Sequence, residues 1–139
     1  MKNQFTQSHL PLHLIVSRIS NGSLSSATRK NSFIINDVPN DLEVNTDEHM
    51  LATVFGSLLN TVINNTENCC IRISAKLYGR VVLLHLKESH RLNSPAFAGN
   101  LRQVQQLAEK IGGTVSISND RNEVTTIVFS FVNNLPLAA

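Results

Sequence analysis

A strand–turn–strand pattern in the middle of the sequence constrains the fold of this chain more than any other feature. Residues 70–77 alternate between apolar and polar side chains, which is typical of a strand with one buried and one exposed face. Tyr78 and Gly79 then provide a turn signal. Residues 81–86 are nearly all apolar, as for a central strand covered on both sides, although His85 should face away from its apolar neighbours. We therefore expect a β-sheet built around this hairpin.

The segment before the hairpin has the spacing of an amphipathic helix. Between residues 47 and 66, apolar side chains recur every three or four positions, and Thr46 or Asp47 can cap the first turn. Leu58 and Val62 belong to the apolar stripe. We therefore expect both side chains to be buried between this helix and the sheet.

Two further helices are indicated by the same kind of periodicity. One covers residues 99–111, and Gly112 and Gly113 should end it. The other is shorter and covers residues 10–20, although Pro11 interrupts its start. The two longer helices, at residues 47–66 and 99–111, can each cover part of one sheet face.

The remaining segments complete the expected fold. Helices and about five strands alternate, which predicts an α/β (α+β) fold, a two-layer sandwich with helices on one face of a mixed sheet. The length fits a single domain, residues 1–139, with a core of about 10–132. Loops are expected at residues 22–31, 37–45 and 88–99, and further strands at 33–36, 114–118 and 125–132.

Composition limits the classes of function. The net charge is +2 and the cations are scattered, which argues against a nucleic-acid partner. No apolar run approaches the roughly 18 residues of a membrane span, and the N-terminal segment is a poor signal peptide. Cys69 and Cys70 are adjacent, so we expect reduced thiols and no metal site. The chain is expected to be cytoplasmic, with no membrane partner.

Three stretches resemble the ATPase domain of sensor histidine kinases, a member of the gyrase, Hsp90, histidine kinase and MutL superfamily. The first is TDEHMLATVFGSLLNTVINNT, similar to that family's helix ending in NLLxNAxKYT. The second is the hairpin IRISAKLYGRVVLLHLKES, which in the family leads into DxGxG. The third and most specific is NLRQVQQLAEKIGGTVSISNDRNEVTTIVFSFV, similar to a helix, a double glycine and a Thr-Thr strand in the family. The resemblance implies a Bergerat-type ATP-binding fold.

The resemblance also implies where a metal would be held. In the family, a helix asparagine binds the Mg²⁺ that bridges the ATP phosphates. Thr61 stands at that position here, with Ser57 one turn earlier and Asn60, Asn64 and Asn65 on either side. A hydroxyl is a poorer Mg²⁺ ligand than a carboxamide oxygen. Ser57, Thr61 and Asn65 are therefore implied contacts of a weakened site.

Three more positions match nucleotide contacts of the family. Glu88 replaces the aspartate that accepts a hydrogen bond from adenine, and Thr125 matches a threonine of the adenine pocket. Gly99 is what remains of the glycine loop, where the free N–H groups of a helix start would bind phosphate. Only ten residues separate Glu88 from Gly99, too few for the family's lid. We expect no cofactor, or weak binding of ATP and Mg²⁺.

These departures favour a degenerate, pseudokinase-like domain in bacterial signal transduction. It would act by contact with a signalling protein, with no catalytic residue of its own and with a closed or narrowed cleft filled by His90 and Phe97. Two alternatives stay open: a functional ATP-binding kinase of the sensor or anti-sigma-factor type, and a histidine phosphotransferase-like protein. A homodimer is compatible with each of them.

Overall fold

The computed structural model describes residues 7–89, 94–119 and 124–133. Along the chain the elements alternate between helices and strands, with two helices in succession near the start. Their bounds are β1 Gln7–Pro11, α1 Leu12–Gly22, α2 Leu24–Arg29, β2 Phe33–Asn36, β3 Glu43–Asp47, α3 Glu48–Asn64, β4 Cys70–Tyr78, β5 Val81–Glu88, α4 Pro95–Lys110, β6 Thr114–Asn119 and β7 Thr125–Val132.

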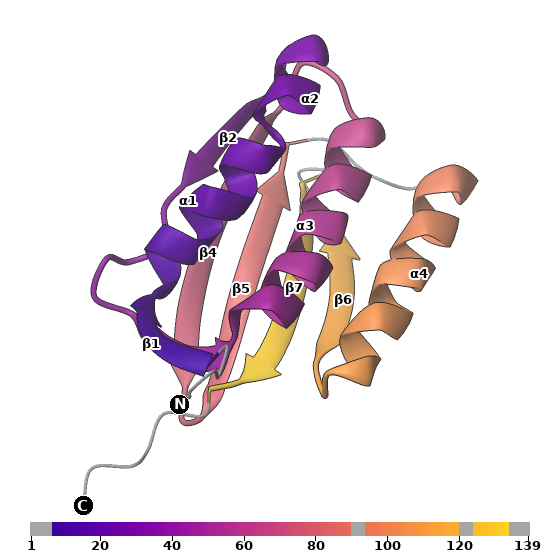
Figure 1. Ribbon diagram of the computed structural model, residues 1–139. Helices are drawn as coiled ribbons and strands as arrows, with labels where there is room; N and C mark the ends of the chain where they lie inside the picture. Colours follow the sequence, from indigo (N-terminus) through magenta and orange to yellow (C-terminus); the bar gives the residue numbers. More distant parts are fainter. Residues whose placement is uncertain (1–6, 90–93, 120–123, 134–139) are drawn as a thin grey trace, which may run out of the picture.

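The main sheet has five strands in the order β2-β4-β5-β7-β6. β2 runs parallel to β4, and the other neighbours are antiparallel, so the sheet is mixed. Helices α1, α3 and α4 cover one face of this sheet, and a separate two-stranded sheet joins β1 to β3 (Figure 1). The expected two-layer α+β sandwich is confirmed.

Helix α3 forms the centre of the helical layer. The side chain of Asp47 caps it by accepting hydrogen bonds from the backbone N–H groups of His49 and Met50, at 3.0 and 3.3 Å. Leu58 and Val62 are fully buried, which confirms the predicted face. The buried side chains of α3 are Leu51, Val54, Phe55, Leu58, Leu59, Val62 and Ile63.

The structure corrects the expected N-terminal third of the chain. Residues 43–47 are a strand rather than a loop, and they pair with residues 7–11, which precede the first helix. Residues 24–29 form a short helix within the expected loop. The β1–β3 pairing joins segments far apart in the sequence, and α2 buries only Ala27, so neither element has a strong local pattern.

In the described part of the chain, helices cover strand β5 on one face, not on both as expected (Figure 1). Val82, Leu84 and Leu86 are fully buried beneath the helices. On the other face Val81 is 38% exposed, and His85 is half-buried there, as its phase in the sequence predicts. Strand β5 therefore carries more apolar side chains than its single helix-covered face accounts for.

Burial of His85, together with the charges of Lys76 and then Lys87, lowers the pKa of its imidazole below the ordinary 6.5. At pH values between this lowered pKa and 6.5, the His85 imidazole binds more protons in the unfolded chain than in the folded one. Stability should therefore be highest above pH 6.5 and fall as the pH drops below it. Urea unfolding at pH about 7.5 and about 5.5 measures the loss. His85→Gln should make this loss smaller, and an unchanged loss would contradict the assignment to His85.

No helix in the described part of the chain is long and apolar enough to cross a membrane. Cys69 and Cys70 are both free thiols, as expected from their adjacency.

Candidate functional site

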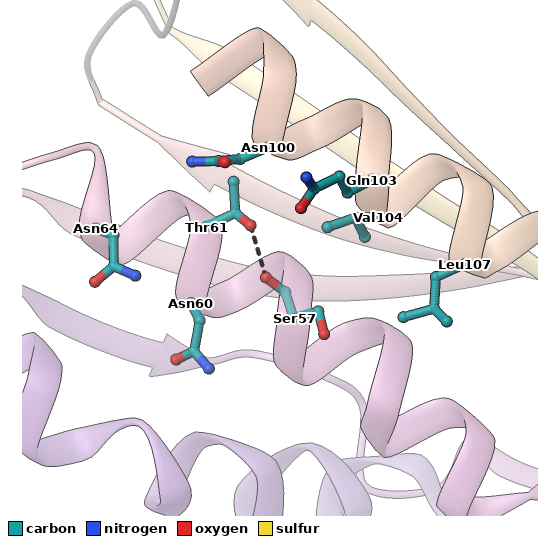
Figure 2. Close-up of a pocket in the computed structure, with 8 residues that line it drawn as sticks. All are labelled: Ser57, Asn60, Thr61, Asn64, Asn100, Gln103, Val104 and Leu107. Carbon is teal, nitrogen blue, oxygen red and sulfur yellow. Dashed lines mark hydrogen bonds between the residues drawn. The ribbon is translucent and has the colours of Figure 1, made fainter. Parts of the chain in front are cut away.

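A groove of about 360 Å³ lies between α3 and α4, where sequence reasoning expects the phosphate end of a nucleotide site. Thr61 lies on the side of α3 that faces Asn100 of α4, and Gln103 and Val104 face back across the groove (Figure 2). The structure thus brings Thr61 and Ser57 together in a cavity. The lining residues are Ser57, Asn60, Thr61, Asn64, Asn100, Gln103, Val104 and Leu107.

The lining of this groove is polar but uncharged. Its polar groups are the hydroxyls of Ser57 and Thr61 and several carboxamides, so it offers hydrogen bonds without a formal charge. The Thr61 hydroxyl already donates to the backbone carbonyl oxygen of Ser57 at 2.8 Å. No cluster of His, Cys, Asp and Glu that could hold a metal ion occurs in the described residues.

Asn65 lies just beyond the end of α3, at its C-cap. Its side-chain amide donates to the carbonyl oxygen of Thr61 at 2.7 Å. This bond holds the Asn65 side chain against the last turn of its own helix. Asn65 does not line the groove with Ser57 and Thr61.

Glu88 and Thr125 are direct neighbours in the register of β5 and β7. Both are buried, at 1% and 0% exposed, and Glu88 continues the helix-facing series of Leu84 and Leu86. Thr125 donates from its hydroxyl to the Asn119 side-chain oxygen at 2.7 Å. The sheet therefore holds a carboxyl group and a threonine side by side at the ends of two central strands.

A buried polar cluster adjoins Glu88. The Cys69 thiol lies 3.2 Å from the Thr66 hydroxyl and 3.4 Å from that of Ser32. Burial raises the pKa of this thiol; hydrogen bonds to Ser32 and Thr66 oppose the rise, and interaction with the Glu88 carboxyl adds to it. The Glu88 carboxyl thus interacts with the buried Cys69 thiol inside the protein. Glu88 also lines a shallow hollow with Cys70 and Val124, and this hollow is separate from the α3–α4 groove.

Gly99 is not at a helix start, contrary to expectation, because α4 begins at Pro95. Ser94 caps the helix: its side-chain hydroxyl accepts a hydrogen bond from the N–H of Phe97 at 3.1 Å. Its backbone carbonyl oxygen accepts the first bond of the helix, from the N–H of Ala98 at 3.0 Å. Pro95 has no N–H. Of the N–H donors in the first turn, that of Phe97 is therefore used by the cap and that of residue 95 is lacking, and Gly99 lies beyond this turn.

His90 and Phe97 are the residues expected to close or narrow the cleft. Phe97 is 2% exposed and belongs to the core, and it is not among the residues that line the α3–α4 groove. The α3–α4 groove is nevertheless open, so the cleft between the long helices has not closed. His90, the other residue expected there, lies outside the described residues.

Sequence reasoning missed Asn100 and Gln103, which form the α4 wall of the groove. They stand three positions apart and share one face of a helix. The signal that would have found them is this three-residue spacing of two amides within the helix expected at residues 99–111.

Solved structures of histidine kinases share this architecture. Acinetobacter baumannii histidine kinase AdeS matches with a TM-score of 0.77 at 11% identity, over 96% of this chain and 70% of that one. The catalytic domain of histidine kinase ThkA matches at 0.69 and 16%, over 91% of this chain and 97% of that one. Full-length ShkA in complex with AMPPNP matches at 0.74 and 14%, over 98% of this chain but 33% of ShkA. No family model and no curated protein sequence matches.

At these identities the likeness is one of fold. The chain has the fold of the histidine kinase ATPase domain over nearly its whole length, with a mixed sheet covered on one face by helices. The resemblance inferred from the sequence is confirmed at this level. ThkA has also been solved in complex with the response regulator protein TrrA.

Proposed function

We propose that this chain is a degenerate histidine kinase-like ATPase domain that acts in signal transduction by contact with a signalling protein. The observation that carries the proposal is the uncharged lining of the α3–α4 groove. A Mg²⁺–triphosphate needs hard oxygen ligands for the metal and cationic or N–H donors for the phosphates. Neither the hydroxyl of Thr61 nor the capped start of α4 supplies them well.

Structural relatives are consistent with a protein partner. ThkA was solved bound to a response regulator, so a domain of this fold occurs in a signalling complex. The proposal assigns this chain a partner of that general kind, either another signalling protein or a second copy in a homodimer. It assigns the chain no catalytic residue and no nucleic-acid or membrane partner.

Nucleotide binding is the second candidate, and a specific observation favours it. Glu88 and Thr125 lie side by side at the ends of β5 and β7, in the positions that the resemblance gives to adenine contacts. ShkA, with the same fold, was solved in complex with AMPPNP. In this candidate the chain is a functional kinase domain with unusual motifs.

Calorimetric titration of the chain with ATP, with and without Mg²⁺, separates the two candidates. We expect a dissociation constant weaker than about 10 μM, equivalent to about −7 kcal/mol, and little effect of Mg²⁺. Tighter, Mg²⁺-dependent binding would overturn the proposal. In that case Glu88→Ala should weaken binding and Lys110→Ala, an exposed change at the far end of α4, should not.

A further inference from the structure

The sheet face opposite the helices has no helix covering it in the described structure (Figure 1). We call it the open sheet face, formed by the alternate side chains of β2 and β4 to β7 that point away from the helices. The strand register orders this face into rows. One row joins Tyr78, Val81 and Val132, and another joins Lys87 to Arg72 and Thr126.

One end of the open sheet face is apolar and exposed. Tyr78 is 61% exposed, Val132 is 47% exposed, and Val81 between them is 38% exposed. The three residues are direct register partners on adjacent strands, so their side chains form one patch. Contiguous exposed apolar side chains mark interaction sites more often than scattered ones do.

The charged side chains that β4 and β5 add to this face are all cations, Arg72, Lys76 and Lys87. Lys76 and Lys87 are exposed on β4 and β5, and their charges reach His85 between them, lowering its pKa after the larger effect of burial. The Arg72 guanidinium forms an ion pair with the Asp37 carboxylate, so this cation is already paired within the protein. The two lysines have no salt-bridge partner among the described residues. Their charge is therefore available to a partner.

We propose that the open sheet face is a docking surface for an acidic amphipathic helix of a partner protein. A sheet buries apolar surface by packing against helices, as the opposite face does here. An acidic helix would place apolar side chains on Tyr78, Val81 and Val132 and carboxylates near Lys76 and Lys87. This inference rests on the proposed function, because it names the surface and the chemistry of the signalling partner.

The dimensions of the face set the length of that helix. From Val81 to Lys87 the strand advances six residues, or about 20 Å at 3.3 Å per residue. A helix of about 14 residues has this length. A partner segment of three to four turns, about the usual length of a helix in globular proteins, can therefore span the face from the apolar row to Lys87.

Two other occupants fit less well. A second copy stacked on the same face would bring like charges together, and this repulsion is unfavourable. Nucleic acid requires a much more positive surface, and the whole chain carries a net charge of only +2. The combination of an apolar row with a few cations suits an acidic protein segment.

A synthetic, end-capped helix of about 14 residues, with leucines on one face and glutamates elsewhere, is the probe. Titrated into isotope-labelled protein, it should shift backbone amide resonances of β4, β5 and β7 and leave those of α3 and α4 unchanged. The double variant Lys76→Glu/Lys87→Glu should weaken binding by about tenfold or more. The same probe with glutamine in place of glutamate should bind about tenfold more weakly as well.

The matched control is Arg102→Glu/Lys110→Glu, the same charge change at exposed positions of α4. It should leave the affinity for the probe within about twofold. Equal weakening by both double variants, resonance shifts on the helical layer, or tighter binding of a single-stranded oligothymidylate would overturn the proposal. If the charge reversal unfolds the protein, Lys76→Gln/Lys87→Gln replaces it and should weaken binding by a smaller factor. ATP affinity is measured separately, so failure here leaves the proposed function standing.

Discussion

Replacing Leu58 with alanine should lower the free energy of unfolding by about 2–5 kcal/mol. Leu58 is 0% exposed, in the middle of α3, where that helix packs on the sheet. The substitution removes buried methyl and methylene groups and leaves a cavity that the neighbouring side chains can fill only partly. Urea unfolding monitored by circular dichroism measures the change.

Leu14→Ala is the matched control for this prediction. Leu14 is also in a helix, but it is 41% exposed, so the same truncation removes much less buried surface. We expect a change within about 0.5–1 kcal/mol, because alanine also has the higher helix propensity. If Leu58→Ala cost less than about 1 kcal/mol, the assignment of the buried face of α3 would be wrong.

The parts of the fold that could be predicted are those with a local pattern. Helix α3 has apolar residues at regular spacing and a capping aspartate at its start, and the β4–β5 hairpin is closed by a short turn. Strands β1 and β3 could not be found in the same way, because each is stabilised by pairing with a segment more than thirty positions away. A strand defined by such a partner carries little signal of its own.

The candidate site was predictable only as far as the resemblance reached. Ser57 and Thr61, which the resemblance implies as site residues, both line the groove. Asn100 and Gln103 on the opposite wall were missed although they lie within the helix expected at residues 99–111, because the resemblance gives those positions no role. The separation of Glu88 from the groove also depends on how side chains pack at the end of β5, which no sequence spacing encodes.

The turn between α4 and β6 contains two glycines, Gly112 and Gly113, and the second of them has no room for a side chain. Gly112 has a positive φ of 81°, which ends the helix, and Gly113 follows in a buried position. A Cβ atom on Gly113 would lie 2.7 Å from the backbone oxygen of Ser130 and 2.8 Å from a ring carbon of Phe129. The backbone of β7 is held in the sheet and cannot shift without breaking hydrogen bonds, so only glycine fits at position 113.

Gly113→Ala should therefore lower the free energy of unfolding by about 1–3 kcal/mol or more. Gly99→Ala is the paired control, since a Cβ there meets nothing within 4 Å and the residue lies inside α4. Removing a glycine from a helix interior should raise stability by about 0.5–1 kcal/mol. Chemical unfolding of both variants gives opposite signs if the structure is correct. A Gly113→Ala protein as stable as the original would mean that the turn between α4 and β6 lies farther from β7 than described.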